Sequence, residues 1–290
     1  MHFSLEQFLW ATLLAAHLVL LVILLGRDRA ARFYWFAVAV GLSAARLLAD
    51  HLLHGKLTTI AFYWQQYVLV LLSAIAGFLV LAELARRAFA HPAPPTPPLK
   101  PATWLSATVL SLGIAAAILF AIGPWPTLAS ITAEPQLTPL RIVWIIALKA
   151  EMLAGILAVL ATFAILLFGR RFGTTLRSHA TAIALGLSTI AISQITVQRI
   201  IEGIIQSAHP TSQADYQRTL RLLTNLDHAR VVLWLLAVLW WIFFLWRDEP
   251  GTTPNPGPTP SDPQPELVPV GSGPTTPAPL QTHADLPDME

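Results

Sequence analysis

The chain contains no cysteine, which excludes disulfides, thiolate metal sites and cysteine nucleophiles. It also has few charged residues: 12% of the 290 residues are charged and 55% are hydrophobic, whereas an ordinary soluble domain carries about 25% charged residues. So few polar residues cannot cover the core of a soluble protein. The composition therefore excludes a soluble globular enzyme and indicates a membrane protein.

Seven apolar stretches are long enough to cross a bilayer, for which a helix needs about 20 residues. They cover residues 8–26, 33–53, 60–84, 103–123, 142–168, 180–206 and 229–246. Each stretch must be helical, because lipid offers no hydrogen-bond partners to the backbone. The sequence thus predicts an all-α bundle of seven transmembrane helices over residues 1–248.

The connections between these stretches differ in basic residues from one side of the membrane to the other. One side holds Arg27, Arg29, Arg32, Arg86, Arg87, Lys100, Arg170, Arg171, Arg177 and Arg247. The other side holds Lys56, Arg141, Arg218, Arg221 and Arg230. Because cytoplasmic loops carry the excess of Lys and Arg, we expect the N-terminus outside and the C-terminus in the cytoplasm. The membrane would be the plasma membrane or a bacterial inner membrane.

The first apolar stretch is not typical of a signal peptide. The residues before it include Glu6 and no Lys or Arg, and the basic cluster follows the apolar run instead of preceding it. We therefore expect an uncleaved first helix.

Proline marks two segments. Six prolines occur in residues 91–101, which predicts a stiff, extended linker between the third and fourth helices. Twelve more lie in residues 250–290, among glycine, serine, threonine and acidic residues. Such a composition buries too little apolar surface to offset its ordering entropy. We predict that 249–290 is a disordered acidic cytoplasmic tail, either a solvated spacer or a ligand for a cytoplasmic Pro-rich-binding partner.

The linker divides the predicted helices into three, one and three, and the two sets of three share features. The second and sixth helices carry Arg46 with Asp50 and Arg199 with Glu202 near their expected outer ends. Matching features four helices apart occur in transporters with parallel repeats. The offset between the matched residues is not constant, and apolar helices resemble one another easily, so the repeat is a hypothesis.

Polar side chains interrupt five of the predicted helices, mostly in the half expected to lie on the outer side. Ionisable residues inside a bilayer cost about 2.5–3.5 kcal/mol each at a helix centre and are read as functional by default. Two helices place theirs on single faces, Ser43, Arg46, Asp50 and His54 on one and Gln194, Gln198, Glu202 and Gln206 on the other. The candidate ligand-binding residues are Arg46, Asp50, Gln65, Gln66, Lys149, Gln194, Gln198, Arg199 and Glu202.

Two interpretations of these residues remain open. In the first, Arg46–Asp50 and Arg199–Glu202 are ion pairs on their own helices and the glutamines bond between helices. In the second, the faces converge on a water-accessible cavity open to the outside. Lys149 and Glu151 lie about 200° apart around their helix, so each needs a partner on another helix or in water.

Enzyme chemistry has little support. Ser43, Asp50, His51 and His54 resemble part of the Ser/Asp/His set of seven-helix lipid amidases, which leaves a minor hypothesis of a membrane hydrolase. A catalytic zinc needs three protein ligands. The last helix has no lysine for a retinal Schiff base, and no P-loop, dinucleotide or kinase motif occurs. We predict no catalytic residue, metal or cofactor, and no binding of nucleic acid.

Two functions follow as hypotheses. The first is a ligand-binding or sensory protein of the lipid bilayer, whose outer cavity takes a small anion or carboxylate. The second is a small-solute or proton-coupled transporter with parallel 3+1+3 repeats and proton sites at Asp50 and Glu202.

Overall fold

The computed structural model describes residues 4–53, 55–89, 101–122, 125–127, 131–132, 134–169, 178–207 and 212–248. All of them belong to one compact unit of the chain, Met1–Gly251. The described residues form helices and connections and contain no strand. His54, most of the predicted linker and the predicted tail at 249–290 lie outside the described residues.

Seven long helices are apolar enough to cross a membrane, which confirms the predicted number of spans. They are α1 (Leu5–Gly26), α3 (Tyr34–Leu53), α4 (Thr59–Phe89), α5 (Pro101–Ile122), α7 (Thr138–Phe168), α8 (His179–Ser207) and α9 (Gln213–Trp246). A short helix, α2 (Arg29–Arg32), joins α1 to α3, and a 3-10 turn, η1 (Pro135–Leu137), precedes α7. The chain is therefore a membrane-embedded helical bundle.

The last helix begins much earlier than predicted. The apolar stretch starts at residue 229, whereas α9 begins at Gln213, where the hydroxyl of Ser212 accepts a hydrogen bond from the backbone N–H of Asp215. A hydropathy pattern detects only the part of a helix that lipid can solvate. Arg218 and Arg221, expected in a loop, are therefore helical.

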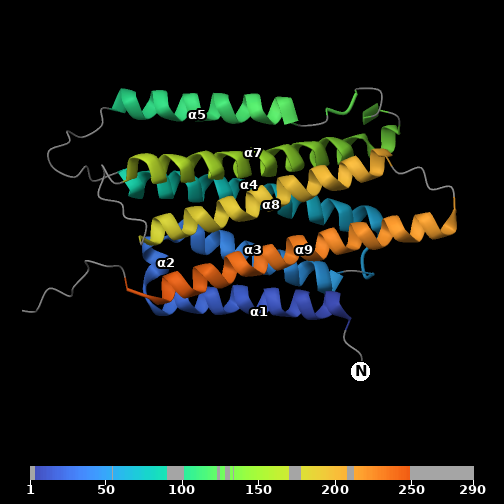
Figure 1. Cartoon of the computed structure of the whole chain (residues 1–290), viewed down its shortest axis with the longest axis horizontal. Coiled ribbons are helices and arrows are strands. Elements are labelled where there is room, and N and C mark those ends of the chain that lie inside the picture. The colour runs from blue at the N-terminus through green and yellow to red at the C-terminus, as the bar shows by residue number, and fades with distance from the viewer. Residues whose placement is uncertain are drawn as a thin grey trace, which may run out of the picture. The chain divides into compact units, whose positions relative to one another are not determined.

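Six helices form a closed ring. Going round it, α1 contacts α3, α3 contacts α4, α4 contacts α7, α7 contacts α8, α8 contacts α9, and α9 contacts α1 again. The remaining long helix, α5, lies at the edge of the bundle and packs on α7 (Figure 1). In this contact, Ala115 and Leu119 meet Met152 and Ile156.

One end of the ring, which we call the α2 end, is filled by apolar side chains. Phe33, Leu24, Val80, Ile183 and Leu245 come from different parts of the chain and are almost completely buried in one cluster. Close-packed side chains of this kind leave little room for water. The α2 end is thus the closed end of the ring.

Candidate functional site

Beyond this cluster the ring encloses a cavity of about 200 Å³, and all six ring helices contribute to its wall. Its floor, on the side of the α2 end, is apolar and aromatic: Phe36, Val80, Leu187 and Trp241 line it. The rings of Phe36 and Trp241 meet edge to face with 5.0 Å between their centroids. Phe36, Val80 and Trp241 are buried in the apolar cluster of the α2 end, and Leu187 packs against it, so the floor is continuous with that cluster.

The opposite part of the cavity is polar. Arg46 of α3, Glu151 of α7, Gln194 of α8 and Arg230 of α9 line it from four helices. A smaller hollow of about 100 Å³ between α7 and α8 shares Glu151, Gln194 and Arg230 and adds Gln198. Both hollows therefore present the same charged groups to whatever occupies them.

Arg46 and Glu151 form the central charge pair. Their closest atoms, Nη1 and Oε1, are 3.8 Å apart, and about a quarter of each side chain is exposed. A hydrogen bond between such atoms would be about 2.7–3.2 Å long. The two charges thus attract each other without sharing a hydrogen bond. The first interpretation predicted an ion pair between Arg46 and Asp50 on the same helix. Within the described part of the chain, the ion pair of Arg46 is instead with Glu151 on α7.

A buried histidine lies in the wall of the same cavity. His17 of α1 is 1% exposed, and its Nδ1 lies 2.8 Å from the carbonyl oxygen of Leu13. A carbonyl oxygen can only accept, so Nδ1 carries the hydrogen and Nε2 is left as an acceptor. The ring also meets Trp234 edge to face. Small hydroxyls complete the polar wall at Ser43, Ser73 and Ser193.

Three of the nine predicted site residues line these hollows, namely Arg46, Gln194 and Gln198. Arg199 and Glu202 instead form an ion pair of 2.8 Å on α8, as the first interpretation predicted. Gln198 donates from Nε2 to the other carboxylate oxygen of Glu202 at 3.1 Å. Each interpretation is therefore partly right for α8. Gln194 lines the cavity, as the second interpretation predicted, and Arg199 pairs with Glu202 on its own helix, as the first predicted.

The other predicted residues lie outside the cavity lining. Lys149 is buried and its Nζ lies 4.6 Å from the centre of the Trp125 ring, so its contact is not on its own helix. Gln65 and Gln66 are half-buried on α4, and amide atoms of both have no hydrogen-bond partner within the described ranges. Asp50 is half-buried near the end of α3. Buried polar atoms of this kind normally bond to protein groups or to ordered water.

Three ionisable residues of the cavity wall, His17, Glu151 and Arg230, were not among the predicted site residues. Arg230 was interpreted as one of the basic residues that set the orientation in the membrane. The predicted helix began at residue 229, so Arg230 lay at its edge. Glu151 was noted but not included among the site residues, and His17 is the only polar residue in the middle of its apolar stretch. The signal that would have found His17 and Glu151 is an ionisable residue within an apolar stretch. Arg230 follows the polar first turns of α9, so it has no such signal.

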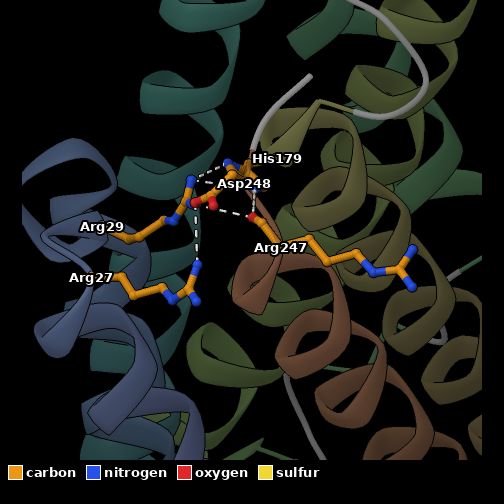
Figure 2. A network of polar contacts seen from close by, with 5 residues as sticks. All are labelled: Arg27, Arg29, His179, Arg247 and Asp248. Atoms are coloured by element: carbon orange, nitrogen blue, oxygen red, sulfur yellow. Dashed lines mark hydrogen bonds and ion pairs between the residues drawn. The ribbon is translucent and has the colours of Figure 1, made fainter. Parts of the chain in front are cut away.

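A second polar network lies at the α2 end of the bundle (Figure 2). Arg29 is 8% exposed; its Nη1 lies 2.7 Å from Nδ1 of His179, and its Nη2 donates to the Arg247 carbonyl and to Asp248, each at 3.1 Å. Arg27 pairs with the same carboxylate oxygen of Asp248. This network connects α2, the start of α8 and the end of α9.

Within the described residues, no group of three His, Asp or Glu side chains is placed to hold a metal ion. His51, a member of the partial hydrolase pattern, is exposed and stacks on Trp10 with 4.0 Å between ring centroids. His54 of that pattern lies outside the described residues.

Comparison with protein-family models, with curated proteins and with solved structures finds no match to this chain.

Proposed function

We propose that this chain is a small-ligand binding or sensory membrane protein, whose ligand carries a carboxylate or another anionic group. The observation that supports this most is the cavity inside the helix ring, where Arg46 and Arg230 face the same space. Ionisable groups within a membrane-spanning bundle are costly, and helix packing alone does not require arginines from two helices, α3 and α9, to line one cavity. Arg46 and Arg230 are partly buried, and Arg230 also pairs with Asp227 on its own helix. The proposal assigns binding, and no catalytic residue, metal or cofactor.

We further propose that the cavity is hydrated from the outer side, with the N-terminus outside and the C-terminus in the cytoplasm. The bias of Lys and Arg between alternating connections supports this orientation. Unpartnered amide atoms of Gln65 and Gln66, on the side away from the α2 end, support the presence of water there. The membrane is a plasma membrane or a bacterial inner membrane.

Signalling in this proposal depends on a cytoplasmic partner of the Pro-rich tail, because the sequence contains no kinase motif that would act in its place. Polyproline-type segments dock on aromatic grooves of partner domains. Co-purification with and without residues 249–290 tests this part, and recovery of the same proteins by both forms contradicts it.

A transporter is the second candidate, because Arg46 with Asp50 and Arg199 with Glu202 occupy matching places in the two predicted sets of three helices. In such a 3+1+3 arrangement α5 would be the connecting helix. Asp50 and Glu202 would then be the proton sites, and solute flux in proteoliposomes unchanged by Asp50→Asn and Glu202→Gln would contradict this mechanism.

The hydrated cavity is tested first by thiol labelling, because the natural chain has no cysteine background. Single cysteines replace Gln194 and Gln198, with exposed Ser207 as the positive control and fully buried Val238 as the negative control. A membrane-impermeant maleimide is added to intact cells and, separately, to inside-out vesicles.

We expect labelling of Gln194→Cys, Gln198→Cys and Ser207→Cys from outside the cell. Labelling of Ser207→Cys alone would mean that the polar groups are sealed between helices, and the binding proposal would be wrong. Labelling of all three only from the vesicles would keep the cavity and reverse the proposed orientation.

A further inference from the structure

The cavity is divided into two chemically different parts, and this division restricts its ligand further than an anionic group alone. The floor is formed by Phe36, Val80 and Trp241 and offers no charged group. The charged groups Arg46, Glu151 and Arg230 all lie in the other part. A ligand that fills the whole cavity therefore has an apolar body at one end and charge at the other.

The charged part contains both signs. A simple carboxylate would bind Arg46, or it would bind Arg230, which also pairs with Asp227 on its own helix. It would then approach the partly buried carboxylate of Glu151, and like charges repel more strongly in such a site than in bulk water. Glu151 thus disfavours a ligand with only negative charge, and it supplies an acceptor for a cationic group.

The distance between Arg46 and Glu151 leaves both side chains able to bind. At 3.8 Å the two form no direct hydrogen bond. Neither side chain has another hydrogen bond or ion pair within the described residues. The guanidinium can therefore donate to a ligand carboxylate while Glu151 accepts from a neighbouring ammonium group.

We infer that the cavity binds an apolar zwitterion, that is, an α-amino acid with an aromatic or branched aliphatic side chain. Its carboxylate lies at Arg46, its ammonium group at Glu151, and its side chain on the floor beside Phe36 and Trp241. The inference rests on the proposed ligand-binding function and names the class of ligand. Sites built to pair every charged group of a ligand reject analogues that lack one of them.

A matched series of four compounds tests the inference. L-Phenylalanine carries all three features; 3-phenylpropanoate lacks the ammonium group, 2-phenylethylamine lacks the carboxylate, and L-alanine lacks the aromatic body. Binding is measured by isothermal calorimetry on the full chain in nanodiscs. We expect phenylalanine to bind at least about tenfold more tightly than each of the other three.

The variant Glu151→Gln tests the role of Glu151 separately from that of Arg46. It removes the acceptor for ammonium, so we expect the preference for phenylalanine over 3-phenylpropanoate to fall by about tenfold or to disappear. Glu134→Gln is the matched control, because Glu134 is exposed, pairs with Arg141 and lies outside the cavity lining. It is expected to keep the preference of the natural chain.

The outcomes distinguish this inference from the proposed function. Equal or tighter binding of 3-phenylpropanoate would overturn the zwitterion and leave a carboxylate-binding protein. Equal binding of alanine would overturn the role of the apolar floor. Tightest binding of 2-phenylethylamine would overturn both. No binding of any compound by protein that unfolds cooperatively would overturn the zwitterion, and the thiol labelling of the cavity would then decide the proposed function. If Glu151→Gln does not fold, Arg46→Gln takes its place, and it is expected to weaken phenylalanine and 3-phenylpropanoate alike.

Discussion

Arg46 on α3 and Glu151 on α7 face each other across the cavity at 3.8 Å, too far for a hydrogen bond and close enough for strong attraction. Removing either charge alone leaves the other half-buried without its counter-charge. We therefore expect Arg46→Gln and Glu151→Gln each to lower the thermal midpoint in detergent, and the double variant to lose less than the sum. A coupling of about 1 kcal/mol is expected for a partly exposed pair, and strict additivity would show that the two charges do not interact.

Glu83 on α4 stabilises the start of α3 in addition to forming a local ion pair on its own helix. Its carboxylate accepts hydrogen bonds from the backbone N–H groups of Tyr34 and Trp35 at 3.0 and 3.1 Å, and it also pairs with Arg87. These N–H groups belong to the first turn of a helix, which has no acceptor of its own for them.

We expect Glu83→Ala to destabilise the protein by about 1–3 kcal/mol, because it leaves these donors and Arg87 without the carboxylate. Glu83→Gln keeps one acceptor oxygen and is expected to lose less. Thermal unfolding in detergent measures both, with exposed Glu6→Ala as the control. Equal effects of Glu83→Ala and Glu6→Ala would contradict the capping role.

The sequence predicts the apolar parts of this fold well, because lipid imposes the same length and composition on every spanning helix. Six of the seven predicted stretches agree with the observed helices within a few residues. The exception is α9, whose first turns at Gln213 are polar and capped by Ser212, so no apolar pattern marks them. The short helix α2 was not predicted. It follows Asp28, whose backbone is left-handed, and amino-acid composition does not indicate such a conformation.

The candidate site was predictable only in part as a set of residues, and its contacts between helices were not predictable. Single-helix spacing places Arg199 beside Glu202, and the structure confirms that pair. Spacing on one helix carries no information about the neighbouring helix. The contact of Arg46 with Glu151 and the position of Arg230 in the cavity wall depend on how the six helices pack, and only the structure shows them.

The network at the α2 end contains both buried hydrogen bonds and exposed ion pairs, so their contributions to stability can be compared. Arg29 is 8% exposed and contacts His179 and the Arg247 carbonyl, whereas the side chain of Asp248 is 82% exposed. Exposed ion pairs contribute about 0–1 kcal/mol, and a buried group that loses its partners costs more. We expect Arg29→Gln to lower the thermal midpoint clearly and Asp248→Asn to leave it almost unchanged. Arg27, which also pairs with Asp248, supplies the control variant Arg27→Gln.

A larger effect of Asp248→Asn than of Arg29→Gln would contradict this ranking. It would show that the ion pair, and not the contact with His179 and the Arg247 carbonyl, holds the ends of α8 and α9 together. Limited proteolysis near the end of α9 gives an independent measurement, since a weakened network exposes this end of the helix.

Gly186 on α8 and Trp241 on α9 show how closely two ring helices approach below the cavity. A Cβ atom at Gly186 would overlap the indole nitrogen of Trp241, whose N–H donates to the Ile183 carbonyl at 3.3 Å. The indole also forms part of the cavity floor, so it cannot move without changing the floor. Gly186→Ala is therefore expected to destabilise the bundle by about 1–3 kcal/mol, as overpacking of a core does.

The matched control is Gly203→Ala on the same helix, where nothing lies within 4 Å of the added atom. Alanine favours a helix over glycine by about 1 kcal/mol, so this variant is expected to be neutral or more stable. The double variant Gly186→Ala with Trp241→Phe removes the overlapping atoms of the indole ring and is expected to regain part of the lost stability. If Gly186→Ala and Gly203→Ala have the same thermal midpoint, α8 and α9 do not approach this closely, and the position of the cavity floor must be revised.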